Sequence, residues 1–413
     1  MATLNIEPRK LKGEVNIPPS KSLSHRAIIC ASLCEEESRI SNVLLSEDIK
    51  ATIEGMRVLG TSIRIEEGNY GMNDLYIRKE REIVEKAVIN CRESGSTLRF
   101  LIPLALVKSS KSEFLGSGKL VERPLNTYYN MFQEKGIYYE NNKGKLPLIL
   151  KQGLESGEFL VNGDVSSQFI SGLLFALPIL ESDSKIKIKN HMESKAYVDL
   201  TINIMKKFGV NIENREYKEF YIKGSQEYKA FNYKVEGDFS QGAFFLVAEA
   251  LGNEIQVQGL DYNSLQGDKE IAGIIKVITK DPRRETIIDA SEIPDLVPIM
   301  AVLASLKLGK TSIINAGRLR IKESDRLKAI CKELKKLGAN IEEKGDGLII
   351  YGKEELEGGA TVHSWNDHRI AMSLAIAATK CKKPLILEES ESVNKSYPHF
   401  WEHYKSLGGL ISE

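Results

Sequence analysis

Residues 165–179, VSSQFISGLLFALPI, carry the pattern from which the fold of this chain can be inferred. The stretch opens with small polar residues and continues into an apolar run of helical length. A helix that is apolar on all sides is expected to be buried, while its first turn exposes free backbone N–H groups. The pattern recurs at five other places: SKSLSHRAIICASLC from Ser20, ESGSTLRFLIPLALV from Glu93, DFSQGAFFLVAEALG from Asp238, IPDLVPIMAVLASLKLG from Ile293 and NDHRIAMSLAIAATK from Asn366.

The starting positions of these six segments are spaced almost evenly. Successive intervals are 73, 72, 73, 55 and 73 residues, so only the fourth is shortened. Self-similarity at a fixed spacing indicates an internal structural repeat. A second series agrees, because amphipathic segments that end in glycine and lead into an apolar strand also recur. The glycines expected to end these helices are Gly60, Gly136, Gly209, Gly338 and Gly408.

Each repeat is expected to run strand, apolar helix, strand, amphipathic helix and further strands, which makes the fold α/β. One interval of the glycine series, from Gly209 to Gly338, is about double, so one copy is degenerate. The degenerate copy falls at residues 274–290, IIKVITKDPRRETIIDA, inside the shortened repeat. Since 413 residues exceed the size of one ordinary core, the chain is expected to form two domains.

Composition and charge exclude several classes of partner. Lys plus Arg and Asp plus Glu both number 57, so no global charge attracts nucleic acid or an acidic membrane surface. The N-terminus lacks the apolar core of a signal peptide, and the longest apolar stretch, residues 172–180, is too short to span a membrane. The five cysteines include no C-x-x-C pair, which favours reduced thiols and a cytoplasmic location.

Any anion site must therefore come from a local cluster, and the starts of the apolar helices supply one. Helix N-termini favour anions, and six of them in one cleft would bind phosphates and carboxylates. Ordinary N-capping explains the polar residues there but not the cations among them. The residues at these starts are Lys21, Arg26, Gly95, Ser166, Ser167, Gln168, Asp295, His368 and Arg369.

Three further cationic stretches lie outside the helix starts. They are VERP at residues 121–124, RLRIKESDR at 318–326 and VNKSYP at 393–398. A run of charges is also typical of a solvated helix face, and this alternative stays open for 318–326 taken alone. Arginine suits carboxylate and phosphate because its fork donates to two oxygens at once.

Five segments resemble the signatures of the 5-enolpyruvylshikimate-3-phosphate synthases, which belong to the enolpyruvyl transferase family. They are SKSLSHR at residues 20–26, SGSTLR at 94–99, VSSQF at 165–169, RLRIKESDR at 318–326 and NDHR at 366–369. The family fold that this resemblance implies has two domains of three βαβαββ units each, with the active site in the cleft between them. The expected first domain comprises residues 1–19 plus 236–413, and the second comprises 20–235.

The resemblance also implies the reaction. The 5-hydroxyl of shikimate 3-phosphate adds to C2 of phosphoenolpyruvate, C3 gains a proton, and the tetrahedral intermediate loses phosphate. Asp295 matches the residue that takes the hydroxyl proton, Glu323 matches the proton donor, and Lys21 lies between the two anionic substrates. Acid–base groups and cations suffice for this chemistry, so no metal and no cofactor are expected.

The substrate contacts are likewise expectations from the resemblance. Shikimate 3-phosphate is expected to contact Lys21, Ser22, Arg26, Ser166, Ser167, Gln168, Ser194, Tyr197, Asp295 and Lys322. Phosphoenolpyruvate is expected to contact Lys21, Gly95, Arg123, Gln168, Arg326, Arg369 and Lys395. His368 is a further candidate. The only expected partners are these small molecules, with no nucleic acid and no membrane, and the chain is expected to be a monomer.

Two rival functions remain. UDP-N-acetylglucosamine enolpyruvyl transferase shares fold and donor, but its reactive cysteine is matched here by Gly118. A non-catalytic anion-binding relative would be expected to have lost Lys21, Asp295 or Glu323. The segment HFWEH at residues 399–403 fits a zinc pattern but lacks a third ligand, so we interpret it as a chance match. Glu93, where many relatives have Asn, and Ser96, where Thr is common, depart from the family pattern, and Arg92 is expected to pair with Glu93.

Overall fold

The computed structural model describes residues 2–68, 71–151, 153–281 and 285–413. Contacts within the chain divide it into unit 1, Met1–Ser20 with Gly237–Glu413, and unit 2, Lys21–Glu236. These boundaries lie one residue from those that the resemblance implies. Pro19 and Gly237 form an antiparallel bridge, so the two points where the chain passes between the units are neighbours.

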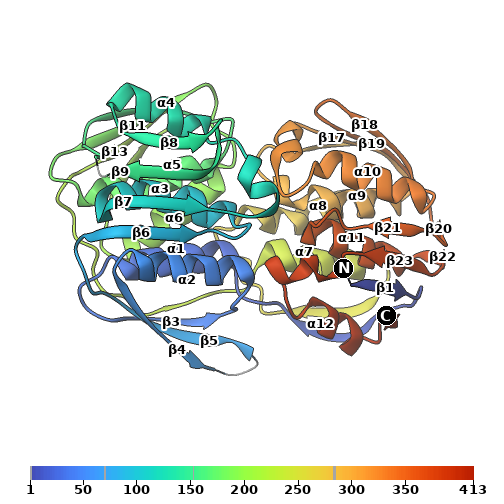
Figure 1. Ribbon diagram of the computed structural model, residues 1–413. Helices are drawn as coiled ribbons and strands as arrows, with labels where there is room; N and C mark the ends of the chain where they lie inside the picture. The colour runs from blue at the N-terminus through green and yellow to red at the C-terminus, as the bar shows by residue number, and fades with distance from the viewer. Residues whose placement is uncertain (1, 69–70, 152, 282–284) are drawn as a thin grey trace. The chain divides into compact units, whose positions relative to one another are not determined.

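Unit 2 consists of three repeats of the expected form (Figure 1). The second repeat forms the sheet β6-β7-β9-β8, in which β6 and β7 are parallel and β9 is antiparallel to both of its neighbours. Its elements are β6 (Val84–Asn90), α3 (Gly95–Lys108), β7 (Ser109–Leu115), α4 (Asn126–Lys135), β8 (Tyr139–Asn142) and β9 (Lys145–Lys151). A 3-10 turn, η2 (Gly118–Glu122), precedes α4.

The other two repeats of unit 2 have the same order of strands. The third forms the sheet β10-β11-β13-β12. Its elements are β10 (Glu158–Asn162), α5 (Ser167–Ala176), β11 (Ser184–Lys189), α6 (Lys195–Lys207), β12 (Ile212–Arg215) and β13 (Glu219–Ile222). The first forms β14-β3-β5-β4, with its opening strand supplied by the end of the unit. Its elements are β14 (Tyr233–Lys234), α1 (Lys21–Ser32), β3 (Ser38–Val43), α2 (Glu47–Val58), β4 (Thr61–Glu67) and β5 (Asn73–Lys79).

Unit 1 has two complete repeats. One forms the sheet β16-β17-β19-β18, and the other, β21-β23-β1-β24, is completed by the N-terminal strand. The first comprises β16 (Thr286–Asp289), η5 (Pro294–Leu296), α9 (Val297–Ser305), β17 (Gly309–Ile314), η6 (Gly317–Ile321), α10 (Arg326–Lys336), β18 (Asn340–Lys344) and β19 (Gly347–Gly352). The second comprises β21 (Thr361–His363), α11 (His368–Ala378), β23 (Leu385–Glu388), η7 (Ser390–Lys395), α12 (Phe400–Ser406), β24 (Ile411–Ser412) and β1 (Thr3–Ile6). A small ribbon pairs β20 (Leu356–Gly358) with β22 (Cys381–Lys383).

The remaining repeat of unit 1 is the degenerate one. It contains β2 (Lys12–Asn16), α7 (Phe239–Ala250), β15 (Glu254–Gln258), η4 (Gly267–Glu270) and α8 (Ile271–Lys280). In the described residues its sheet consists of the two parallel strands β15 and β2. Among the described residues, no strand lies between α8 and β16, so the antiparallel pair found in the other repeats is missing. The degenerate repeat predicted from the sequence is therefore confirmed, and the missing pair of strands explains the shortened interval.

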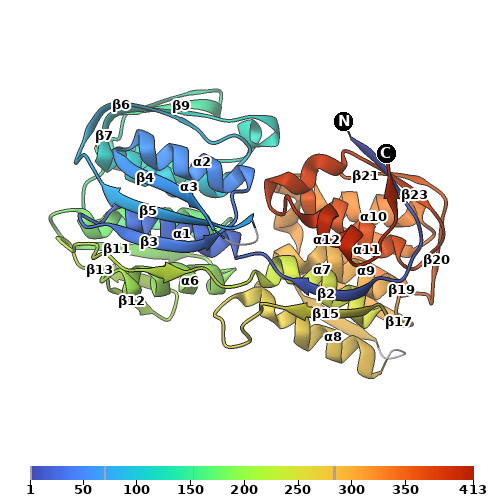
Figure 2. The ribbon, with the colours of Figure 1, turned by 90° about the horizontal axis from the view of Figure 1, so that it is seen from below.

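The apolar helices form the cores of the two units, as their sequences predict. In unit 2 the sheets flank α1, α3 and α5, which Figures 1 and 2 show from two directions. Twelve of the residues of α3 are buried, including Pro103 in its middle. The glycine prediction is also confirmed, because all five predicted helix-ending glycines have positive φ angles between 66° and 91°. A left-handed residue after a helix favours glycine because a side chain there is strained.

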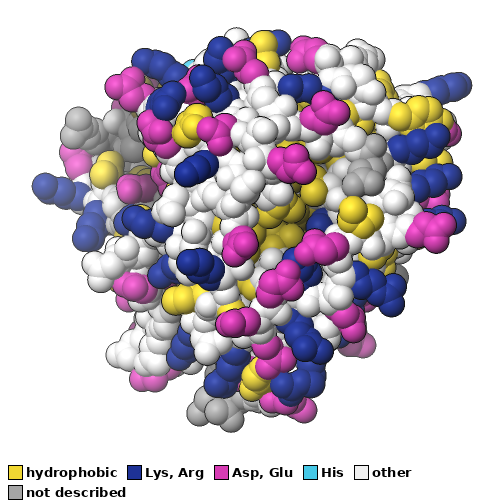
Figure 3. Space-filling model, turned by 90° about the vertical axis from the view of Figure 1, so that its left-hand side faces the viewer, with side chains coloured by type: hydrophobic (Ala, Val, Ile, Leu, Met, Phe, Trp, Pro, Cys, Tyr) yellow, Lys and Arg dark blue, Asp and Glu magenta, His cyan; other side chains and the backbone are white. Residues whose placement is uncertain are grey.

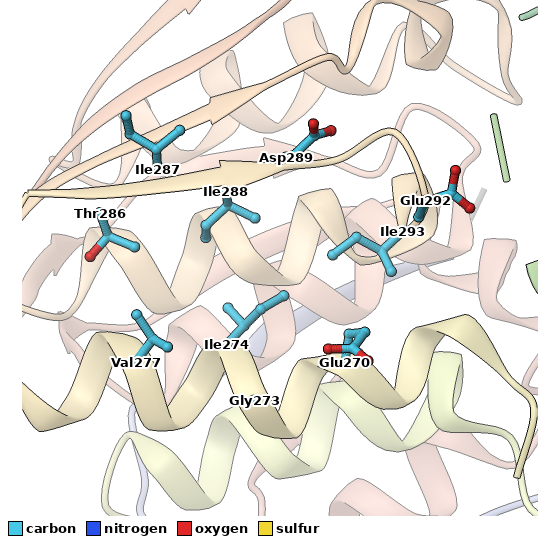
Figure 4. Close-up of a pocket in the computed structure, with 10 residues that line it drawn as sticks. All are labelled: Glu270, Gly273, Ile274, Val277, Thr286, Ile287, Ile288, Asp289, Glu292 and Ile293. Atoms are coloured by element: carbon cyan, nitrogen blue, oxygen red, sulfur yellow. The ribbon is translucent and has the colours of Figure 1, made fainter. Parts of the chain in front are cut away.

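A pocket in unit 1 lies between α8 and β16 (Figure 4). Its volume is about 430 Å³, and isoleucine and valine make up half of the residues that line it. The acidic residues Glu270, Asp289 and Glu292 line one end, while Val277 and Thr286 lie toward the other. None of the site residues predicted from the sequence lines this pocket.

The surface agrees with the balanced composition. In Figure 3, Lys and Arg side chains are interspersed with Asp and Glu on the face that is turned to the viewer. Within the described residues, we find no helix of the length and apolar character that crossing a membrane requires.

Candidate active site

Asp295 is the centre of a charged cluster in unit 1. It lies in η5, immediately before the buried helix α9. Arg326 donates from Nη1 to its Oδ1 at 2.9 Å, and Arg369 donates from Nη2 to its Oδ2 at 2.9 Å. Burial acts against the charged carboxylate, but Arg369, Lys322 and Arg326 together lower the pKa of Asp295 well below its ordinary value.

Arg326 joins three carboxylates. Besides Asp295, it donates from Nη2 to Glu323 Oε2 at 2.6 Å and from Nε to Asp367 Oδ2 at 2.8 Å. Its side chain is only 2% exposed. Burial opposes the charge, but Asp367, Glu323 and Asp295 raise the pKa of Arg326 above its ordinary value. Arg326 is the first residue of α10 and is buried, so at this residue the segment 318–326 does not form a solvated helix face.

Lys322 lies beside the same cluster. Its Nζ is 4.0 Å from Asp295 Oδ1, and its side chain is 24% exposed. Burial lowers the pKa of Lys322 to about 8, although Asp295 acts in the opposite direction. This lysine therefore changes its charge in a range of pH where an ordinary lysine stays protonated.

The segment 366–369 supplies the third side of the cluster. Asp367 is the N-cap of α11 and accepts a hydrogen bond from the backbone N–H of Arg369 at 2.9 Å. His368 and Arg369 are the first two residues of that helix and are both buried. Lys395 lies at the end of η7 and donates from Nζ to the carbonyl oxygen of Asn366 at 2.6 Å. Unit 1 thus brings together Asp295, Lys322, Glu323, Arg326 and Arg369 directly, and Lys395 through Asn366.

In unit 2, the starts of α3 and α5 are tied to each other by Gln168. Its Oε1 accepts from Arg99 Nη1 at 2.8 Å, and its Nε2 donates to Ser96 Oγ at 2.9 Å. Ser166 is the N-cap of α5, and its side chain accepts from the backbone N–H of Gln168. Ser167 is the first residue of α5 and is 7% exposed.

Gly95 is the first residue of α3, and the guanidinium of Arg123 lies against it. A Cβ atom at Gly95 would be 2.7 Å from Arg123 Nη1 and 3.0 Å from Arg99 Nη1. The φ angle of Gly95 is not left-handed, so the turn itself does not require glycine. The glycine therefore leaves room for two guanidinium groups at the start of the helix.

The start of α1 is fixed by contacts to other helices of unit 2. Lys21 donates to Asp48 Oδ2 at 2.9 Å, and Asp48 lies on α2. Arg26 is 2% exposed and donates to Thr201 Oγ1, to the Ser22 carbonyl and to the Tyr197 carbonyl at 2.7–2.9 Å. Burial lowers the pKa of Arg26 to about 10. These bonds bring Ser22, Arg26 and Tyr197 together, and they occupy three N–H groups of a guanidinium that was expected to contact substrate.

Ser194 lies three residues before Tyr197. It is the N-cap of α6, is 3% exposed and has a left-handed φ of 55°. The backbone N–H of Tyr197 donates to the Ser194 carbonyl at 3.1 Å. Ser194 therefore belongs to the same local group as Ser22, Arg26 and Tyr197.

A chain of buried hydrogen bonds connects the starts of α1 and α3 through α2. His25 Nδ1 is 2.7 Å from Thr52 Oγ1, and Thr52 Oγ1 is 2.7 Å from Thr97 Oγ1. Thr97 donates in turn to Ser94 Oγ at 2.7 Å. Ser94 also caps α3 by accepting from the backbone N–H of Thr97. The two helix starts are thus held by side chains that are fully enclosed.

Several residues that take part in these contacts were not predicted from the sequence as parts of the site. Asp48 and Thr52 belong to no motif, and only the folded chain shows that they contact Lys21 and His25. Arg99 and Asp367 lie inside quoted motifs, and their charge next to a helix start was the signal that could have identified them.

Two sequence interpretations remain, one on Arg92 and one on HFWEH. Arg92 forms ion pairs with Glu47 and Glu54, and its expected pairing with Glu93 stays a prediction. In HFWEH, His399 Nδ1 lies 2.9 Å from Glu402, while His403 Nδ1 lies 2.6 Å from Tyr397 Oη. Across the part of the chain that the structure describes, no group of three or more His, Cys, Asp or Glu side chains is placed to hold a metal ion.

Known proteins match this chain over its whole length. Residues 6–404 match the family described as EPSP synthase (3-phosphoshikimate 1-carboxyvinyltransferase). A 3-phosphoshikimate 1-carboxyvinyltransferase of Clostridium novyi is 53% identical, covering 100% of this chain and 99% of the relative. One of Clostridioides difficile is 52% identical with the same coverage. The solved EPSP synthase of Acinetobacter baumannii is 22% identical with a TM-score of 0.79 and 100% coverage of both chains, a likeness that concerns the fold.

The two units of βαβαββ repeats have the two-domain fold of the enolpyruvyl transferases, and carboxylates and cations lie at their helix starts. The family match over residues 6–404 and the identities above 50% are more specific. The chain belongs to the EPSP synthase family.

Proposed function

We propose that this chain transfers the carboxyvinyl group of phosphoenolpyruvate to the 5-hydroxyl of 3-phosphoshikimate, releasing phosphate, in the shikimate pathway that leads to chorismate and the aromatic amino acids. The observation that carries the proposal is the position of Asp295 between the guanidinium groups of Arg326 and Arg369. A carboxylate and two forked cations are the groups that a proton transfer between anionic substrates needs. The family match supports the same reaction.

In the proposed first step, Asp295 accepts the proton of the 5-hydroxyl group. At the same time the oxygen of that hydroxyl group forms a bond to C2 of phosphoenolpyruvate. C3 receives a proton from Glu323, which gives a tetrahedral intermediate with a methyl group. In the second step the methyl group returns a proton to Glu323, and the bond from C2 to the phosphate oxygen breaks. The leaving phosphate takes the proton held by Asp295, so the enol ether and phosphate leave and both carboxyl groups regain their starting forms. Lys21 stabilises the negative charges of both substrates.

The low pKa of Asp295 would make it a weak base if its two arginines stayed bound to it. The carboxylate of phosphoenolpyruvate presents the same pair of oxygens and can compete for Arg326 and Arg369. When those arginines turn to the substrate, Asp295 loses the charges that lower its pKa and becomes more basic. Substrate binding would then activate the base at the moment when it is needed.

The proposal assigns the remaining side chains by their charge and place. We propose that both sets of groups, one in each unit, act on the same pair of substrates. The contacts proposed for 3-phosphoshikimate are Lys21, Ser22, Arg26, Ser166, Ser167, Gln168, Ser194, Tyr197, Asp295 and Lys322. The contacts proposed for phosphoenolpyruvate are Lys21, Gly95, Arg123, Gln168, Arg326, Arg369 and Lys395, with His368 beside them.

An assay of phosphate release with different acceptors tests this function. We expect release only when phosphoenolpyruvate and 3-phosphoshikimate are both present. UDP-N-acetylglucosamine in place of 3-phosphoshikimate should give no release above background. Equal or faster release with UDP-N-acetylglucosamine would mean that the chain is a UDP-N-acetylglucosamine enolpyruvyl transferase. No release with either acceptor would mean that it is a non-catalytic relative.

The charge of Lys322 should make the binding of 3-phosphoshikimate depend on pH. Because burial lowers its pKa to about 8, the lysine is charged below that pH and loses its charge as the pH rises through it. We expect kcat/KM for 3-phosphoshikimate to fall above about pH 8, since this ratio reports ionisation of the free enzyme. In Lys322→Arg the fall should move to higher pH, and an unchanged profile would remove Lys322 from substrate binding.

Gly95→Ala should weaken the binding of phosphoenolpyruvate without destabilising the fold. The new methyl group would lie 2.7 Å from Arg123 Nη1 and would displace that guanidinium. We expect KM for phosphoenolpyruvate to rise on the order of tenfold, because displaced positioning groups cost up to about 10²-fold. The melting temperature should stay nearly constant, since φ at this position is not left-handed.

Gly136→Ala is the matched control for this variant. Gly136 has a φ of 66° and open space around its Cβ position, so alanine is strained there but collides with nothing. It should lower the melting temperature, at a cost of about 1 kcal/mol, and leave KM unchanged. The same effect of both variants on both quantities would contradict the role of Gly95 in making room for Arg123.

A cytoplasmic location and a monomeric state complete the proposal. All five cysteines are free and buried, which supports a reducing environment. Size-exclusion chromatography with light scattering should give one species near the chain mass of 46.2 kDa.

A further inference from the structure

The turn before Asp367 has an unusual backbone. Trp365 and Asn366 are consecutive non-glycine residues with positive φ angles of 58° and 50°. A left-handed conformation costs an L-residue about 1–2 kcal/mol, so two in succession persist only where other contacts hold them. The turn is followed directly by Asp367, His368 and Arg369, and strained backbone of this kind is often found at functional sites.

Glu333 supplies the first of these contacts. Its Oε1 accepts from the indole Nε1 of Trp365 at 2.8 Å, and its Oε2 accepts from the backbone N–H of His363 at 3.1 Å. The side chain of Glu333 is only 1% exposed, and Lys336 Nζ lies 2.6 Å from Oε2. A buried carboxylate with donors on both oxygens fixes its partners firmly.

A second carboxylate holds the other side of the turn. Glu389 Oε2 accepts from the backbone N–H of Asn366 at 2.7 Å, and the Glu389 carbonyl accepts from Ser364 Oγ at 3.0 Å. The backbone N–H of Trp365 donates to His363 Nδ1 at 2.7 Å. Hydrogen bonds therefore hold the strained turn from two sides, to Glu333 on α10 and to Glu389 just after β23.

The turn at residues 363–366 also positions cations of unit 1. Asp367 accepts from Arg326 Nε at 2.8 Å, and the Asn366 carbonyl accepts from Lys395 Nζ at 2.6 Å. Arg326 and Glu333 are on the same helix, seven residues or about two turns apart, so they lie on similar faces of it. The helix that presents Arg326 thus also fixes the turn that leads to Arg369.

We propose that Glu333 is a positioning residue that aligns Arg326, Arg369 and Lys395 for one anionic substrate by holding the turn at residues 363–366. This inference rests on the proposed function for the identity of that anion, the phosphoenolpyruvate carboxylate and phosphate. No motif in the sequence marks Glu333, and we do not expect it to contact the substrate. The alternative is that Glu333 only stabilises unit 1.

Glu333→Gln separates these two roles. The amide keeps the shape of the side chain but has one acceptor oxygen, so it can accept from Trp365 or from His363 and not from both in the present way. We expect KM for phosphoenolpyruvate to rise about tenfold, within the effect of misplaced positioning groups. KM for 3-phosphoshikimate should change less than twofold, because most of its proposed contacts are in unit 2. Assays at a temperature well below the melting transition exclude partial unfolding as the cause.

Lys336→Met is the matched control. It removes the ion pair to Glu333 and leaves both hydrogen bonds to the turn in place. Its kinetic constants should be those of the wild type, although its melting temperature can fall slightly. Trp365→Phe removes only the indole donor and should raise KM for phosphoenolpyruvate in the same direction. In the double variant, Trp365→Phe should add little to the effect of Glu333→Gln, because both changes remove the same contact between Trp365 and Glu333.

The indole signal of Trp365 reports the contact directly. The chain has two tryptophans, so Trp401→Phe assigns the two indole N–H resonances in a ¹H–¹⁵N spectrum. Glu333→Gln should move the Trp365 resonance, and Lys336→Met should leave it close to its wild-type position. This reading does not depend on activity.

The outcomes are distinct. An inactive wild type would overturn the proposed function, whereas the spectrum would still show whether Glu333 holds the turn. An active wild type in which Glu333→Gln raises both KM values equally, or changes only the melting temperature, would overturn the positioning role. The role would also be wrong if Lys336→Met reproduced the effect of Glu333→Gln.

Discussion

Asp295→Asn is expected to lower turnover by about 10²–10⁴-fold, the usual contribution of a general base. Asparagine keeps the size of the side chain but cannot take the proton of the 5-hydroxyl. The same change releases Arg326 and Arg369 from a carboxylate that they both bind in the free protein. We therefore expect a phosphoenolpyruvate analogue to bind the variant as tightly as the wild type, or more tightly. Stopped-flow turnover and calorimetric titration measure the two effects separately.

This combination of effects is specific to the role proposed for Asp295. A residue that only binds substrate would lose affinity on substitution, and a residue that only supports the fold would lower the melting temperature. The fold should survive because Arg326 keeps two carboxylate partners, Glu323 and Asp367. Turnover near that of the wild type would remove Asp295 from the proton transfer.

Glu323→Gln is expected to reduce turnover by a similar factor, about 10²–10⁴-fold, for a different reason. Glutamine can still accept the hydrogen bond that Arg326 Nη2 makes at 2.6 Å, so the cluster should keep its geometry. It cannot deliver a proton to C3. In D₂O the wild type should introduce deuterium at C3 of the product, because the intermediate carries a methyl group that loses one of its three hydrogens.

Deuterium incorporation distinguishes this role from simple charge stabilisation. In Glu323→Gln the rate of incorporation should fall together with turnover, as mass spectrometry of the product can follow. Normal incorporation at a normal rate would mean that another group protonates C3. Slow turnover with deuterium entering phosphoenolpyruvate rapidly would show that Glu323 acts after protonation.

Most of the architecture could be predicted from the sequence because two independent series of residues indicate the same repeat. The apolar helices and the glycines that end the amphipathic helices keep the same spacing, and both depend on local chemistry. All five predicted glycines have positive φ, and the shortened interval corresponds to the repeat in which the described residues form no antiparallel strands. Local patterns of this kind specify helices and turns even without knowledge of the packing.

The site was less accessible because its decisive contacts join residues far apart in the chain. Motifs identified Lys21 and Arg326, but their partners Asp48 and Asp367 become evident only when helices pack together. Glu333 belongs to an amphipathic helix, where a glutamate would ordinarily face solvent. Its 1% exposure follows from the turn that it binds, which no periodicity predicts.

The structure also changes the meaning of two predicted residues. Gly95 was expected to contact phosphoenolpyruvate, and the structure shows that its backbone is not left-handed and that Arg123 lies against it. Arg26 was expected to contact substrate, yet it donates to Ser22, Tyr197 and Thr201. Its proposed contact with 3-phosphoshikimate must use the N–H groups that these bonds leave.

The most direct test of the proposed transfer is ³¹P NMR of a single turnover with the protein in excess over equal amounts of phosphoenolpyruvate and 3-phosphoshikimate. We expect the phosphoenolpyruvate signal to be replaced by one equivalent of inorganic phosphate. The 3-phosphate signal should move to that of the enolpyruvyl ether in the same proportion. Phosphate without the ether would mean that the protein hydrolyses phosphoenolpyruvate, and unchanged signals for both substrates would contradict the proposed transfer.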